Sequence, residues 1–137
     1  MKRYIMAVAL LLSGIPIAGA QDDGFMTIHE FKSKSGTLLG QLQVRYISRE
    51  IFDSLKIVKA AAKQEEVLYR IDNAIFYSRG ELEKEIYDPG FYGYKIAELA
   101  ADHVTLTYMR NKGKSASDNF IIKWDSASQA FHRQSVH

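Results

Sequence analysis

Hydrophobic and polar residues alternate along several short segments of this 137-residue chain. In four of these runs the apolar side chains share one face and the polar side chains share the other. The apolar members are Leu42, Val44 and Tyr46; Val67, Tyr69 and Ile71; Val104, Leu106 and Tyr108; and Phe120, Ile122 and Trp124. A period of two in runs rich in β-branched and aromatic residues predicts strands with one covered face. We therefore expect a mainly β fold, built as an antiparallel meander or a sandwich-like sheet.

Polar turn signals separate the last of these strands. Residues 111–118 form a polar run, and Asp125 to Ser128 form a second one before Phe131. Such clusters of asparagine, aspartate, serine and glycine mark loops and turns. The chain from Val104 onward is expected to be a three-stranded antiparallel meander. Trp124 would then lie in the core, because large aromatic residues in alternating strands are mostly buried.

The segment 48–66 supports two interpretations. It contains good helix formers, Ser48 could cap a helix, and apolar residues recur at helical spacing at Ile51, Leu55, Val58 and Ala62. A helix here would make the fold α+β. In the other interpretation Leu55 and Ile57 face the core from a strand, and residues 60–65 form a loop. The sequence leaves both open.

The first twenty residues have the organisation of a secretory signal peptide. Lys2 and Arg3 precede an apolar stretch from Ile5 to Leu12, and the segment ends in Ala18-Gly19-Ala20. This pattern predicts cleavage between Ala20 and Gln21, and the apolar stretch is shorter than the roughly 20 residues that a membrane span needs. We expect a single mature domain, 21–137, with no transmembrane span, in the periplasm or secreted.

Removal of this segment changes the charge balance. The chain has 18 basic and 16 acidic residues, and the two extra positive charges, Lys2 and Arg3, lie in the signal peptide. The mature chain is then formally neutral, which argues against nucleic acid or a membrane surface as the partner. The absence of cysteine rules out disulfides, cysteine nucleophiles and cysteine-ligated zinc. No cofactor is expected.

The most suggestive stretch for binding is IYDPGFYGYK, residues 86–95, which places Tyr87, Phe91, Tyr92 and Tyr94 around a Pro-Gly turn. Tyrosines on a constrained loop are typical of protein-binding surfaces, because they bring a large contact area at a low cost in entropy. Alternatively, Phe91 and one or two of the tyrosines fold back and cap the open end of the sheet.

A second candidate surface consists of Arg110, Lys112 and Lys114, which begin the polar loop after Tyr108. These three positive charges could bind an acidic partner or an anionic glycan. More often, such charges form only the solvated tip of a hairpin, since isolated surface charges contribute little energy.

Catalytic motifs are missing from the sequence. It contains no G-x-S-x-G, no S-x-x-K, no H-E-x-x-H and no phosphate-binding glycine loop. His29-Glu30 and Asp102-His103 are adjacent pairs, and adjacent residues on a strand point to opposite faces, so neither pair is expected to act together. An enzyme would need a site assembled from separated residues, for example His103, Asp102, Tyr108 and Arg110.

From Asp53 to Gln134 the sequence resembles the small FG-GAP/VCBS-like domains of exported bacterial proteins. The matching stretches, in order, are DSLKIV, VLYRIDNAIFY, DPGF, VTLTY and FIIKWD, followed by Phe131. The calcium loop of that family, Asp-x-Asp-x-Asp-Gly, is absent. The resemblance therefore implies a β-rich, non-catalytic interaction module without its metal, and a fold-level likeness does not decide function.

Together these features favour an exported, non-catalytic binding module that contacts another exported or envelope protein through surface loops. A more specific version is an inhibitor or immunity protein directed against a cell-wall hydrolase or a toxin. A small enzyme with a dispersed site is the less favoured alternative. The sequence does not predict the oligomeric state.

Overall fold

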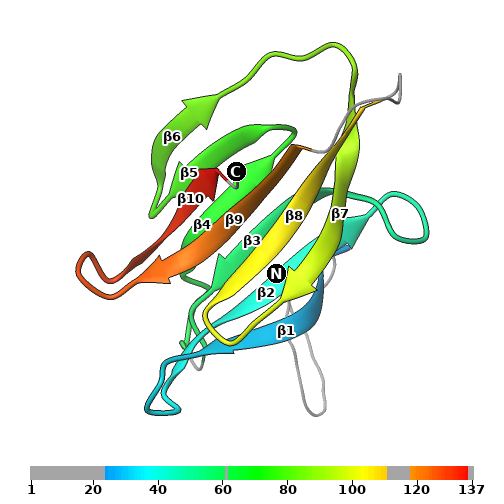
Figure 1. Ribbon diagram of the computed structural model, residues 1–137. Helices are drawn as coiled ribbons and strands as arrows, with labels where there is room; N and C mark the ends of the chain where they lie inside the picture. The colour runs from blue at the N-terminus through cyan, green and yellow to red at the C-terminus, as the bar shows by residue number, and fades with distance from the viewer. Residues whose placement is uncertain (1–23, 61, 111–117, 136–137) are drawn as a thin grey trace.

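The computed structural model describes residues 24–60, 62–110 and 118–135. The expected signal peptide, residues 1–20, lies outside these ranges. The described residues contain ten strands and no helix (Figure 1). The strands are β1 (Met26–Lys32), β2 (Leu38–Tyr46), β3 (Phe52–Val58), β4 (Val67–Asp72), β5 (Ile75–Ser78), β6 (Glu81–Glu85), β7 (Phe91–Leu99), β8 (His103–Arg110), β9 (Asp118–Asp125) and β10 (Ala130–Ser135). The prediction of a mainly β fold is confirmed.

The strands form two antiparallel meanders within one curled sheet. Strands β1 to β6 pair in succession, and so do β7 to β10. The two meanders join where Phe52 of β3 pairs with Tyr94 of β7. Residues 86–90 carry the chain from β6, at one edge of the sheet, to β7 in its interior, and they arch over one end of the molecule (Figure 1). The predicted final meander corresponds to β8, β9 and β10.

The helical interpretation of 48–66 is wrong, because the segment contains β3 and then a loop. Leu55 pairs with residues of both β2 and β4, so β3 is an interior strand of the first meander. Both of its faces are covered, since Lys56 is also buried and its Nζ lies 2.9 Å from Glu65 Oε2. A strand covered on both faces has a nearly continuous run of buried positions, and such a run is compatible with helical spacing as well.

The core is rich in aromatic side chains. Its fully or almost fully buried members come from both meanders and include Phe31, Phe52, Tyr69, Phe76, Tyr94, Phe120 and Phe131. Trp124 is partly buried and packs edge-on against Phe131, with ring centroids 5.1 Å apart. Phe120 and Ile122 are buried on the same strand, as expected. Trp124 is therefore mainly a packing residue.

Candidate functional site

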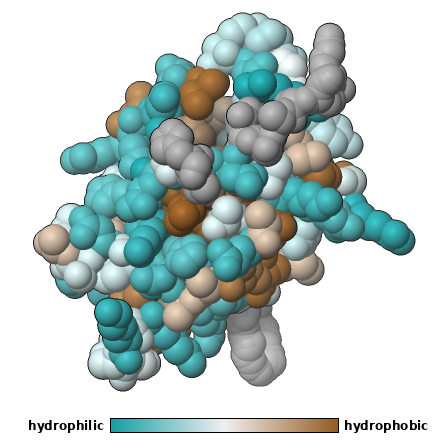
Figure 2. All heavy atoms as spheres, in the orientation of Figure 1, coloured by the Kyte–Doolittle hydropathy of each residue, from teal (hydrophilic) through white to brown (hydrophobic). Residues whose placement is uncertain are grey.

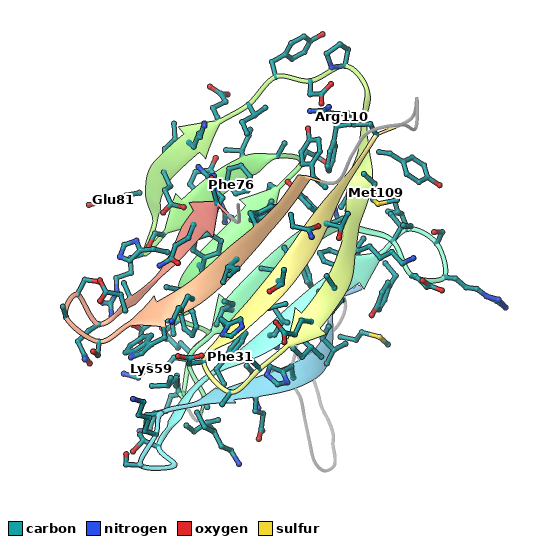
Figure 3. The ribbon with its side chains drawn as sticks, in the orientation of Figure 1. Phe31, Lys59, Phe76, Glu81, Met109 and Arg110 are labelled. Atoms are coloured by element: carbon teal, nitrogen blue, oxygen red, sulfur yellow. The ribbon has the colours of Figure 1, made fainter. Side chains whose placement is uncertain are left out.

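Asp88 fixes the loop between β6 and β7. Its Oδ1 accepts a hydrogen bond from the Gly90 amide at 2.9 Å, and its Oδ2 accepts one from the Tyr108 hydroxyl and one from Arg110 Nε, both at 3.1 Å. The Phe91 amide also donates to the Asp88 carbonyl at 3.0 Å, which closes a tight turn. Figure 3 shows Arg110 beside this loop, at the end of β8. One carboxylate thus holds the turn and attaches it to the neighbouring strand.

The structure separates the four aromatic residues of this stretch into two pairs. Tyr94 is fully buried, and Phe91 is half-buried with its ring centroid 5.0 Å from that of Tyr94 and 5.1 Å from that of Tyr108. These two side chains close one end of the core, as in the capping interpretation. Tyr94 consequently offers no surface to a partner.

Tyr87 and Tyr92 point outward. Tyr87 is 89% exposed and Tyr92 is 45% exposed. Arg110 is also exposed and pairs with Asp88 at 3.1 Å. Lys112 and Lys114 lie outside the described residues. The structure therefore retains Tyr87, Tyr92 and Arg110 as accessible members of the predicted binding surface, and we call Tyr87 and Tyr92 the exposed tyrosine pair.

The hydrogen bonds to Asp88 also set its acidity. The Gly90 amide, followed by the Tyr108 hydroxyl and the Arg110 guanidinium, stabilises the carboxylate and lowers the pKa of Asp88 below its ordinary value of 3.8. A lowered folded-state pKa means that the charged form stabilises the loop above the ordinary pKa. This contribution is lost as the pH falls through the lower, folded-state pKa.

Replacement of Asp88 by asparagine is expected to loosen the loop while the sheet stays folded. Asparagine keeps the shape of the side chain but removes the charge that the Arg110 guanidinium contacts. In a pH titration from about 6 to about 2, the wild-type Gly90 amide resonance should shift as Asp88 protonates, and the variant resonance should not follow this titration. An unchanged titration in Asp88→Asn would show that another acid controls the loop.

Asp102 and His103 form a hydrogen-bonded pair, contrary to the expectation that adjacent residues diverge. Asp102 precedes β8 and so does not follow strand alternation, and His103 Nδ1 lies 2.9 Å from Asp102 Oδ1. This contact lowers the pKa of Asp102. Tyr108 and Arg110, however, lie at the other end of β8. The four residues of the dispersed-enzyme hypothesis are thus not brought together.

His29 and Glu30 do not pair with each other. His29 Nε2 lies 2.7 Å from the Ala100 carbonyl oxygen, and the carboxylate of Glu30 accepts a hydrogen bond from Gln41. The histidine therefore ties β1 to the turn between β7 and β8.

A chain of polar contacts that the sequence did not suggest crosses from the β9–β10 turn to β6. Ser128 Oγ lies 3.0 Å from His132 Nε2, His132 Nδ1 lies 3.6 Å from Glu83 Oε2, and Glu83 Oε1 accepts a hydrogen bond from the buried Tyr69 hydroxyl at 2.9 Å. This order resembles a serine–histidine–acid arrangement. The Ser128 hydroxyl, however, donates its single proton to Asp125 Oδ2 at 2.9 Å, which lowers the pKa of Asp125. The chain therefore braces the turn and does not activate Ser128 as a nucleophile.

Glu83 is distant in the sequence from Ser128 and His132, and only the curling of the sheet brings it to them. No spacing motif could have identified them. Within the part of the chain that the structure describes, no three histidine, aspartate or glutamate side chains are grouped so that they could hold a metal ion. The same residues include no apolar helix of membrane-spanning length.

Comparison with known proteins gave no match to a family, to a curated protein or to a solved structure. The resemblance to FG-GAP/VCBS-like domains stays a prediction. Function must therefore be argued from the site.

Proposed function

We propose that this protein is an exported, non-catalytic binding module that contacts a partner protein through the exposed tyrosine pair. One observation supports this most directly. Tyr87 is 89% exposed in a loop that three hydrogen bonds to the Asp88 side chain hold in place, one from the Gly90 amide and two from side chains of β8. Exposing the apolar surface of a large aromatic side chain to water is unfavourable in free energy. Tyr87 and Tyr92 are nevertheless exposed beside a well-packed core.

The loop combines exposure with order. Binding costs less when the contacting segment is already fixed, because less conformational entropy is lost on association. Tyrosine adds a large amphipathic area with few rotatable bonds, so its side chain is also cheap to order. The exposed Arg110 beside the loop completes a surface of the composition found in binding hot spots, where tyrosine and arginine are enriched.

The signal-peptide pattern of residues 1–20 supports a partner that is itself exported or part of the cell envelope. An inhibitor or immunity protein for a cell-wall hydrolase or a toxin is the more specific form of this proposal. Its test is whether the purified protein protects the partner's target.

Affinity capture from an envelope extract tests the proposal. The baits are the wild-type protein, Tyr87→Ala combined with Tyr92→Ala, and Leu99→Ala as a control for the loss of an exposed apolar side chain at the far end of β7. We expect wild type and the control to retain the same partner and the double variant to bind it at least about tenfold more weakly. Equal retention by all three baits would contradict the proposed surface.

A further inference from the structure

Among the described strands, three lie at an edge of the sheet: β1, β6 and β10. An edge strand presents a row of peptide N–H and C=O groups that can pair with another chain unless something covers them. The three edges differ in how far the protein itself occupies these groups.

The edges of β10 and β1 are partly occupied. On β10, the Phe131 carbonyl accepts a hydrogen bond from Ser78 Oγ at 2.9 Å, and the Arg133 amide donates to Glu83 Oε2 at 3.5 Å. On β1, the Lys32 amide donates to the Ala101 carbonyl at 2.7 Å, and two register shifts interrupt the strand. Both strands are thereby fastened to other parts of the molecule.

The edge of β6 is different. Its backbone pairs with β5 on one side, and no residue of the described chain pairs with the other side. Four of its five residues are exposed, and the strand lies at the margin of the molecule (Figure 1). In this respect β6 is the most open of the three edges.

The charges on β6 restrict what can pair with it. The strand has the sequence ELEKE, with glutamates at 81, 83 and 85 and one lysine at 84. Glu81 points away from the sheet at this margin (Figure 3), and this face of the molecule carries many hydrophilic side chains with hydrophobic ones among them (Figure 2). A second copy of β6 would bring acidic residues opposite acidic residues, which is destabilising. A basic strand would instead place positive charges opposite these acidic residues, which is stabilising.

A groove of about 250 Å³ lies next to this edge, between β6 and the β9–β10 turn. Glu81, Leu82 and Glu83 line one side, and Ser128, Ala130 and His132 line the other. Arg79 also reaches the groove, but its guanidinium donates to the Gln129 carbonyl. In strand addition the backbone bonds provide affinity, and pockets for alternate side chains provide specificity. The exposed carboxylate of Glu81 suits a lysine or arginine side chain, and the Glu83 carboxylate, which already contacts Tyr69 and His132, adds a second negative charge beside it.

We propose that the free edge of β6 accepts an extended, basic segment of a partner protein as an additional strand. The segment pairs its backbone with β6 and places a lysine or arginine side chain in the groove beside Glu81 and Glu83. The groove lies at the Glu81 end of β6, whereas Tyr87 follows the Glu85 end, and the inference does not depend on the proposed function of the exposed tyrosine pair.

Fluorescence anisotropy with a labelled eight-residue peptide of alternating lysine and valine tests this inference. We expect saturable binding that weakens as the salt concentration rises. The same peptide with N-methyl groups on alternate residues cannot donate along one edge, and it should bind at least about tenfold more weakly. A peptide of alternating glutamate and valine should not bind. No binding of the lysine peptide, or equal binding of its N-methylated form, would overturn the inference.

Variants of the protein locate the site. Glu81→Lys combined with Glu85→Lys should reduce binding of the lysine peptide by at least about tenfold, because both substitutions turn attraction into repulsion. Both residues are exposed, so the fold should be retained. Tyr87→Ala combined with Tyr92→Ala should leave peptide binding unchanged. Unchanged binding by the Glu81/Glu85 variant would place the peptide elsewhere and refute the β6 site, whatever the result for the tyrosine pair.

Discussion

Replacement of Tyr94 by alanine is expected to lower the free energy of unfolding by about 3–5 kcal/mol, the range for truncating a large buried aromatic residue. Tyr94 is fully buried where the two meanders meet, and it pairs with Phe52 across that junction. Its ring also lies 5.0 Å from Phe91, 5.7 Å from Tyr108 and 5.8 Å from Phe120, measured between centroids. Removal of this side chain would leave a cavity that touches both halves of the sheet.

Chemical denaturation followed by circular dichroism measures this effect. Tyr94→Phe is the matched control, because it keeps the ring and should cost about 1 kcal/mol or less. Tyr92→Ala is a second control on the same strand, and its exposed side chain should matter little for stability. A loss below about 1 kcal/mol in Tyr94→Ala would mean that Tyr94 is not a core residue. Because Tyr94 is buried, loss of partner binding in a Tyr94 variant would indicate loss of folding. Loss of binding in a Tyr92 variant would instead indicate a lost contact with the partner, because Tyr92 is exposed.

Replacement of Gly93 by alanine is expected to cost about 2–5 kcal/mol, from steric overlap and from backbone strain together. A Cβ atom at this position would lie 2.4 Å from Ile51 Cγ2 and 3.0 Å from the Phe52 carbonyl oxygen. The φ angle of +156° is also one that residues with a side chain rarely adopt. Gly93 therefore allows the β2–β3 connection to lie directly against β7.

Gly90→Ala is the control for this substitution, because it alters the same segment at a position with space. Its Cβ would meet only Asp88 Oδ1, at the ordinary contact distance of 3.4 Å. We expect a thermal unfolding midpoint several degrees lower for Gly93→Ala than for Gly90→Ala, since 1 kcal/mol corresponds to roughly 2–8 °C in small domains. Equal midpoints would show that the β2–β3 connection moves aside without cost.

The alternation of apolar and polar residues predicted strands β2, β4, β8 and β9. Leu42 and Val44, Tyr69 and Ile71, and Val104 and Leu106 are all buried, each pair on one face of its strand. Strand β6 was not among them, because ELEKE has no apolar face. Its place at the sheet edge explains this composition, since a strand with little buried surface needs few apolar residues.

The candidate site was located by the sequence only as a segment. The stretch IYDPGFYGYK did contain the exposed tyrosine pair and the Pro-Gly turn. Tyr92 and Tyr94 are nevertheless chemically identical and two residues apart, yet one is 45% exposed and the other fully buried. A register shift between Phe91 and Gly93 interrupts the simple alternation here. Where the register shifts, spacing alone no longer tells which side chains share a face.

By itself, the sequence determined the features that depend on local chemistry. These are the strand class, which follows from side-chain alternation, the turn positions, which follow from glycine, proline and aspartate, and the absence of thiol chemistry. The tertiary structure alone decided which distant residues meet. Asp88 contacts Tyr108 and Arg110, and His132 approaches Glu83. Strand β6 keeps an open edge because the next strand, β7, pairs with β3 and β8 instead. Such contacts depend on how the sheet curls and where the two meanders join, and these are set by the packing of the whole core, which no short stretch of sequence encodes.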